Sequence, residues 1–178
     1  MDFIITTITK VNADLIYQAQ ALAQKFNKKF VTRNNLSLER LKQDNNVDNI
    51  LIFTKDGLKA HTSQGDLFFH LNMAQLRILN LNRNQKDHMV EAMDLKPKMS
   101  VLDCTLGLGT DATVASYIVG ENGKVVGLES ATLIYLITKY GLANFNHDNI
   151  AINHSLRRIE SFNLHYLDYL KAQGDNSF

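Results

Sequence analysis

The chain contains almost no cysteine or proline and no tryptophan. Among its 178 residues, Cys104 is the single cysteine and Pro97 the single proline. One cysteine cannot form an intrachain disulfide, which suits a reducing compartment and predicts a cytoplasmic protein. Cys104 is more typical of a small packed residue than of a nucleophile.

Long apolar runs are also missing. The longest, residues 133–137, is far shorter than the roughly 20 apolar residues that cross a membrane. The first seven residues lack the basic start and long apolar core of a secretory signal. The sequence therefore predicts no membrane partner.

An excess of charge of one sign is lacking too. Nineteen Lys and Arg stand against 18 Asp and Glu, a formal net charge of +1, so there is no global basic signature for nucleic acid. Residues 1–100 nevertheless carry 14 basic against 10 acidic residues, and residues 101–178 carry 5 against 8. A mildly basic first part beside an acidic second part suits a nucleic-acid substrate. Ordinary solvated faces explain the same asymmetry equally well.

Signatures of nucleophilic, phosphate-loop and metal chemistry do not occur. The chain has no G-x-S-x-G and no G-x-x-x-x-G-K-[ST], and its six histidines and one cysteine show no metal-ligand spacing. We therefore expect no metal and no evident catalytic nucleophile.

The most informative stretch is Val101-Leu102-Asp103-Cys104-Thr105-Leu106-Gly107-Leu108-Gly109-Thr110-Asp111-Ala112. A short apolar strand ends in an aspartate, a glycine loop follows, and Thr110 and Asp111 suit the start of a helix. This pattern predicts a ligand site at the carboxyl end of a parallel strand in an open α/β sheet.

Two cofactors fit this loop. Gly107 to Ala112 matches the dinucleotide pattern G-x-G-x-x-G/A, which is weak by itself. Dinucleotide strands usually run straight into the first glycine, whereas Asp103 here precedes Gly107 by four residues. The stretch resembles motif I of class I S-adenosylmethionine (SAM) methyltransferases. We therefore favour SAM over NAD, and a glycine loop that binds no ligand is the third alternative.

The remaining chain predicts two parts. Residues 1–70 form a small α/β appendage, with strands at 3–7, 29–32, 49–54, 58–61 and 67–70 and helices at 13–26 and from 37. Residues 71–178 form a Rossmann-like domain, with helices at 72–81, 85–94, from 110, 131–142, 150–157 and 164–172, strands ending at 103 and over 124–129 and 159–163, and a final turn at 174–177. Glu129 ends the second strand 22 residues after Gly107, where an acid accepts hydrogen bonds from ribose hydroxyls.

These residues resemble the bacterial small-subunit ribosomal RNA guanine-N2 methyltransferases and their Gram-positive relatives, a branch of the class I methyltransferases. The resemblance runs from about residue 65 to the end, and its most specific part is Asp-Cys-Thr-Leu-Gly-Leu-Gly-Thr-Asp-Ala. It implies ribosomal RNA or the small ribosomal subunit as the partner. It also implies SAM contacts, with Asp103, Gly107, Gly109, Thr110 and Asp111 around the methionine end, Glu129 and Ser130 at the ribose, and His165 and Tyr166 near the adenine.

The family has a fourth strand that ends in an Asp-Pro-x-Phe-like motif, which binds the target amine. This chain stops at Asp175-Asn176-Ser177-Phe178, where that strand should begin. The resemblance therefore implies only the N-terminal half of the class I sheet, a C-terminally truncated chain, and no methyl-transfer activity in this form. It also predicts an exposed sheet edge, with Val101 and Leu102 facing solvent or a partner. The chain should then be poorly soluble, form a homodimer through that edge, or be stabilised only by a complementing fragment. An NAD-dependent oxidoreductase fragment and a non-catalytic Rossmann-like interaction module remain the alternatives.

Overall fold

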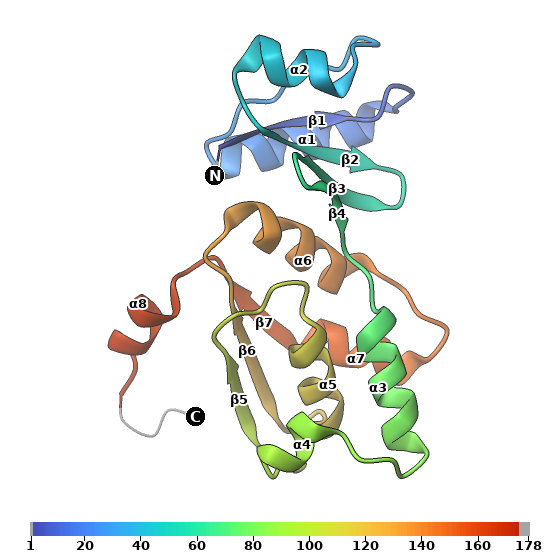
Figure 1. Ribbon diagram of the computed structural model, residues 1–178, viewed down its shortest axis with the longest axis vertical. Coiled ribbons are helices and arrows are strands. Elements are labelled where there is room, and N and C mark those ends of the chain that lie inside the picture. Colours follow the sequence, from blue (N-terminus) through green and yellow to red (C-terminus); the bar gives the residue numbers. More distant parts are fainter. Residues whose placement is uncertain (1, 175–178) are drawn as a thin grey trace. The chain divides into compact units, whose positions relative to one another are not determined.

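The computed structural model divides the chain into two compact units, Met1–Phe69 and His70–Phe178. It describes residues 2–174. The described residues form a four-stranded sheet in the first unit and a three-stranded sheet in the second. Figure 1 shows the two sheets with their helices. Each unit thus has a sheet of its own, with its own helices.

The sheet of unit 1 is mixed, with strand order β1-β2-β3-β4. β1 (Phe3–Thr7) pairs in parallel with β2 (Asn49–Thr54), which pairs antiparallel with β3 (Gly57–Thr62) and through it with β4 (Gly65–Phe68). The predicted strand at 29–32 is wrong, because this segment makes only a single parallel bridge from Phe30 to Ile5. Asn34 and Asn35 adopt positive φ angles just beyond it, so the chain turns away before a longer ladder can form.

Two capped helices cover this sheet. α1 (Ala13–Lys25) begins after Asn12, whose side chain accepts a hydrogen bond from the Leu15 N–H, and α2 (Leu38–Asn45) begins after Ser37, which caps it in the same way. Leu38 and Leu41 of α2 pack on the sheet face that carries Ile4, Ile50 and Ile52. Side chains alternate along a strand, so Phe3, Ile5, Leu51 and Phe53 point to the opposite face, and all four are buried.

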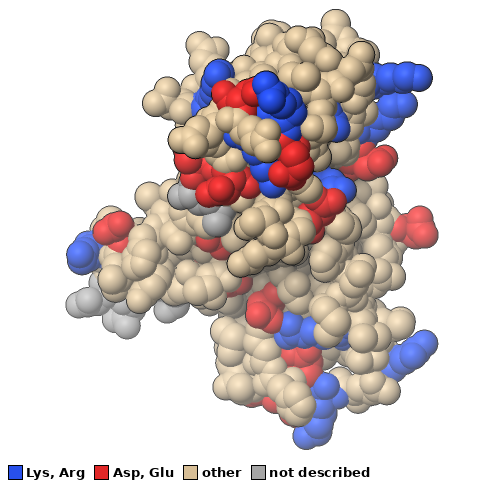
Figure 2. Space-filling view, turned by 45° about the horizontal axis from the view of Figure 1, so that its top comes forward, with Lys and Arg blue, Asp and Glu red and all other residues tan. Residues whose placement is uncertain are grey.

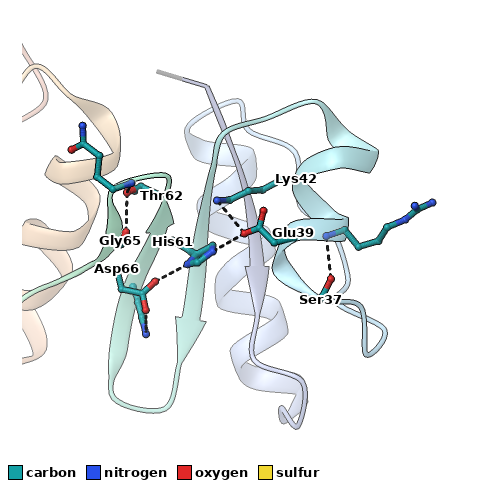
Figure 3. Close-up of polar contacts among 10 residues, drawn as sticks. Ser37, Glu39, Lys42, His61, Thr62, Gly65 and Asp66 are labelled. Atoms are coloured by element: carbon teal, nitrogen blue, oxygen red, sulfur yellow. Dashed lines mark hydrogen bonds and ion pairs between the residues drawn. The ribbon is translucent and has the colours of Figure 1, made fainter.

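A charged network joins α2 to the β3–β4 hairpin. One ring nitrogen of His61 lies 2.7 Å from Asp66 Oδ1 and the other lies 3.1 Å from Glu39 Oε1 (Figure 3). Lys42 lies 3.6 Å from Glu39, and Lys59 lies 2.6 Å from Asp66. The charges of this cluster therefore compensate one another.

The sheet of unit 2 is parallel throughout, with strand order β5-β6-β7. β5 (Ser100–Asp103) lies at an edge of the described sheet, β6 (Lys124–Leu128) lies in the middle, and β7 (Ile159–Phe162) lies at the other edge. The carboxyl ends of these parallel strands lie at the same end of the sheet. This arrangement confirms the predicted Rossmann-like α/β fold.

Between residues 70 and 174, six helices accompany this sheet. They are α3 (Asn72–Asn82), α4 (His88–Ala92), α5 (Thr110–Val119), α6 (Thr132–Asn144), α7 (Ile150–Arg158) and α8 (Tyr166–Lys171). α5 contacts all three strands, and α3 and α7 pack against α5.

Two of these helices are shorter than predicted. The Asp87 side chain caps α4 and Asp94 ends it with a positive φ, so residues 85–87 and 93–94 lie outside it. The His165 side chain similarly fixes the start of α8. Of the predicted turn at 174–177, all but Gly174 lies outside the described residues. No helix between residues 2 and 174 is long and apolar enough to span a membrane.

Candidate functional site

The glycine loop follows β5 and is anchored by Leu106. Gly107 and Gly109 adopt left-handed φ angles of 52° and 76°, which glycine reaches without strain. The Leu106 N–H donates to the Leu128 carbonyl at 2.9 Å, and the Leu106 side chain is only 3 % exposed. A Cβ on Gly127 would lie 2.5 Å from Leu106 Cδ1, so the missing side chain in β6 makes room for the loop.

Glu129 lies directly against this loop. Its Oε2 accepts a hydrogen bond from the Gly107 N–H at 3.0 Å, and its Oε1 accepts one from the Ala131 N–H at 2.8 Å. The sequence predicts a ribose ligand for this carboxylate but not its bonds to the backbone. A carboxylate has about four lone-pair sites, so two bonds leave acceptor capacity for a diol.

Asp103 ends β5 beside two other carboxylates. Burial raises the pKa of its carboxyl, and the charges of Asp111 and Glu129 raise that pKa further. The Thr105 N–H donates to Asp103 Oδ1 at 3.0 Å and opposes this effect. Three acids therefore converge at the carboxyl end of β5, where a ligand cation would be stabilised.

Asp111 is held by an arginine that the sequence pattern does not single out. Arg77, in α3, donates from Nη1 to Asp111 Oδ1 at 2.5 Å. The same guanidinium donates from Nε and Nη2 to Asp87 at 2.7 and 2.9 Å, a two-point contact that fixes its plane. Arg77 lies 34 residues before Asp111, and only the packing of α3 on α5 brings the two together.

The helix after the loop begins without a side-chain cap. The residue before α5 is Gly109, which has no side chain to accept from the first N–H groups of the helix. Thr110 and Asp111 occupy its first turn. The amino end of α5 therefore presents backbone donors beside the three acids.

A pocket of about 180 Å³ is lined by the residues that the sequence predicts to contact the ribose and the adenine of the cofactor. Its lining residues are Cys104, Thr105, Leu128, Glu129, Ser130, Leu164, His165 and Tyr166. The rings of His165 and Tyr166 stack with centroids 4.6 Å apart. His165 Nδ1 accepts the Leu167 N–H at 3.3 Å, so this ring also caps α8.

A second pocket, of about 200 Å³, lies along β5 and α4. Asp103 and Asp111 line it together with the apolar side chains Met89, Met93, Val101, Leu102, Ala112 and Ala115. Val101 is only 7 % exposed. The expectation that Val101 faces solvent or a partner is therefore wrong, because this side chain is covered within the unit.

The donor set fits SAM better than NAD. SAM carries a sulfonium and an ammonium group, and Asp103 and its two acidic neighbours would stabilise these positive charges. SAM also carries a ribose diol, which would donate hydrogen bonds to Glu129. The pyrophosphate of NAD would bring negative charge toward the same acids. The stacked rings of His165 and Tyr166 are the aromatic groups that line the pocket on this side. Among residues 2–174, no three His, Cys, Asp or Glu side chains form a group that could hold a metal ion.

Comparison with known proteins agrees with this geometry. The family model of protein-L-isoaspartate(D-aspartate) O-methyltransferase matches residues 83–157. A crystal structure of a SAM-dependent methyltransferase from Neisseria gonorrhoeae has the same fold, with a TM-score of 0.59 at 16 % identity over 97 % of this chain and 65 % of that one. The fold is thus that of the class I SAM-dependent methyltransferases, and S-adenosyl-L-methionine is the cofactor that this fold implies.

The chain belongs to the family of the Bacillus subtilis protein YpiP. It is 33 % identical to YpiP over 174 residues, which cover 97 % of this chain and 67 % of YpiP. A protein-L-isoaspartate O-methyltransferase of Methanothermobacter thermautotrophicus is 34 % identical over 71 residues, 38 % of this chain and 33 % of that enzyme. The chain thus spans about two thirds of the length of YpiP and of the Neisseria protein.

Proposed function

We propose that this chain is the cofactor-binding part of a methyltransferase that modifies the N2 amine of guanine in ribosomal RNA. The observation that carries the methyl-transfer part is the convergence of Asp103, Asp111 and Glu129 around the glycine loop. SAM, when bound, supplies a methyl group on a sulfonium that is already a good leaving group. The resemblance of residues 65–178 to the guanine-N2 branch supports the RNA target.

The residues of this chain would bind and orient the cofactor and would not themselves form or break bonds. Asp103 would hold the ammonium of the cofactor, Glu129 and Ser130 would lie at its ribose, and His165 and Tyr166 would lie at its adenine end. Gly107 and Gly109 let the backbone approach the methionine end, where Thr110 and Asp111 begin the helix. Correct alignment of two reactants accounts for much of an enzymatic rate, so a rigid loop is the main contribution expected from this part.

Surface charge gives the RNA target limited support. The face in Figure 2 carries Lys and Arg beside Asp and Glu, without a broad field of one sign. RNA contact would therefore depend on local basic groups rather than on overall charge. The mildly basic residues 1–100 are where we place that contact.

A second candidate substrate is the carboxyl group of an isoaspartyl residue in a damaged protein. The match of residues 83–157 to the isoaspartate O-methyltransferase model and the archaeal relative both favour it. The two candidates differ in the bond that forms, an N-methyl amine in one and an O-methyl ester in the other.

Labelled methyl transfer distinguishes the two. The chain and full-length YpiP are each incubated with methyl-labelled SAM and either undermethylated small ribosomal subunits or an isoaspartyl peptide, with D103N variants as controls. We expect YpiP to label RNA, the label to be recovered as N2-methylguanosine, and the D103N control to lose it. A base-labile label on the peptide alone would replace the RNA assignment by the protein one. Labelling of neither substrate by YpiP would reject both.

A further inference from the structure

A second kind of cavity lies within unit 1. It has a volume of about 700 Å³ and is lined by Ile8, Thr9, Lys10, Val11, Asn12, Asp14, Leu15 and Lys55. The lining residues from Ile8 to Asn12 follow β1 directly, Asp14 and Leu15 lie in the first turn of α1, and Lys55 is the first residue after β2. The cavity therefore lies at the carboxyl ends of the two parallel strands of the unit.

The cavity lies where the connections of neighbouring strands lead to opposite edges of β1. After β1 the chain forms α1 and returns to one edge of β1, where Phe30 bridges Ile5. It then forms α2 and continues into β2, which pairs with the other edge of β1. The connections after β1 and before β2 thus lead to opposite edges of β1, and open α/β sheets bind ligands at such a switch point.

The side chains around the cavity are suited to an anion. Lys10 and Lys55 are exposed, and within residues 2–174 neither makes a salt bridge. Lys42 and Lys59 are by contrast paired with the carboxylates of Glu39 and Asp66, and Figure 3 shows the pair that Lys42 forms. Asp14 is the one acid of the lining, and its Oδ2 accepts from Gln18 Nε2 at 2.9 Å along α1.

Apolar groups form the rest of the lining. Ile8, Val11 and Leu15 are half-buried and flank the two lysines. Two ammonium groups beside an aliphatic surface match a molecule that joins a phosphate to a flat ring. The Asn12 side chain is already used by the Leu15 N–H, so it adds little to recognition.

We propose that this cavity binds a nucleoside phosphate, with Lys10 and Lys55 on the phosphate and the aliphatic side chains against the base or sugar. The ligand is either a free nucleotide or a nucleotide unit of an RNA strand. The proposal is independent of the cofactor site, because every lining residue belongs to unit 1.

Titration of the whole chain by amide NMR tests the proposal. The probes are GMP, guanosine, inorganic phosphate and a single-stranded RNA hexamer. We expect GMP to shift the amides of residues 8–15 and 55 and to bind at least tenfold more tightly than guanosine. A hexamer that binds much more tightly than GMP at the same amides identifies an RNA strand as the source, and equal affinities identify the free nucleotide.

Two double variants that remove the same charge test whether GMP binds at this cavity or is attracted by the overall positive charge of the unit. K10Q/K55Q should lower GMP affinity at least tenfold. K25Q/K29Q removes the same charge at the far end of α1, from side chains that are equally exposed, and should leave the affinity within twofold. Equal losses in both variants, guanosine binding as tight as GMP, or no shifts at these amides with any probe would each overturn the proposal. None of these readouts depends on SAM or on methyl transfer.

Discussion

At the scale of single residues, the position of Asp103 suits ligand binding but lowers the stability of the folded chain without ligand. Its pKa is raised by burial and by the neighbouring acids, so its ionised form is disfavoured in the folded chain. A raised carboxyl pKa means that folding is favoured most when this group is protonated, and that this contribution is lost as pH rises through the folded pKa. At neutral pH, ionised Asp103 therefore opposes folding of the chain without ligand.

We predict that D103N raises the melting temperature of the ligand-free chain at pH 7 while weakening SAM binding at least tenfold. Asn keeps an acceptor for the Thr105 N–H, so the turn survives. The increase in melting temperature should become smaller as pH falls. It should vanish below about pH 3.9, the ordinary pKa of aspartate, where the Asp103 carboxyl is protonated in both the folded and the unfolded chain. Thermal unfolding at several pH values measures it, with the exposed E121Q as control. A lower melting temperature for D103N at pH 7 would contradict this account.

The sequence predicted the parts of the site that depend on local order. Asp103, Gly107 and Gly109 lie within one strand–loop–helix pattern, and Glu129 ends the next strand, so spacing alone places them. Arg77 could not be found in this way, because its partners Asp87 and Asp111 follow it by 10 and 34 residues. The pattern gives no sign that an arginine on α3 reaches the first turn of α5.

At the scale of elements, Asp87 ties α4 to α3. Its Oδ1 accepts from the Met89 and Val90 N–H groups at 3.1 Å, and the Arg77 guanidinium beside it lowers the pKa of its carboxyl to about 2. A lowered carboxyl pKa gives stability that is present above the unfolded value and is lost as pH falls through about 2.

We predict that D87A lowers the free energy of unfolding at pH 7 by about 2–4 kcal/mol, from the lost cap and the arginine left without its main partner. D87N keeps an acceptor for the cap but not the charge, so it should lose only about 2 kcal/mol. Urea unfolding measures both. Identical losses in the two variants would mean that the cap contributes nothing.

The contact between β6 and the glycine loop gives a second prediction at this scale. G127A forces a Cβ against Leu106, which should cost about 1–3 kcal/mol by overpacking and displace the loop. L106A alone should cost about 2–5 kcal/mol through the cavity that it leaves.

The double variant L106A/G127A tests whether the two changes act through this contact. Without the leucine the new methyl group has room, so the combined loss in urea unfolding should fall short of the sum by more than about 0.5 kcal/mol. Additive losses would show that Gly127 is needed for another reason.

Capping residues and apolar periodicity predict most of the helices and strands. The elements that they predict wrongly differ from the structure for local reasons. Asn12 and Ser37 mark the starts of α1 and α2 in the sequence, and both caps form. The strand predicted around Phe30 does not form because the chain turns at Asn34 and Asn35. α4 is shorter than predicted because Asp87 caps it and Asp94 adopts a positive φ, neither of which apolar spacing reveals.

At the scale of the whole molecule, the edge of β5 is where we expect the chain to associate. Among the described residues it pairs only with β6, and its free edge adjoins the pocket that Met89 and Met93 line. We predict a weak dimer through this edge, because unpaired strand edges recruit other strands. Sedimentation should show association that M93E weakens, whereas M73E, at an exposed position of α3, should leave the association unchanged. A monomer at every concentration would remove the dimer from the account.

We expect the acids at the carboxyl ends of β5 and β6 to select a cationic, ribose-bearing cofactor. Calorimetry of the chain with SAM, S-adenosylhomocysteine and NAD tests it most directly. We predict that SAM and S-adenosylhomocysteine each bind at least tenfold more tightly than NAD. E129A should weaken both by about 1–3 kcal/mol, because a ribose hydroxyl loses its buried acceptor. NAD binding as tight as SAM binding, or unchanged SAM affinity in E129A, would contradict the assignment of this site.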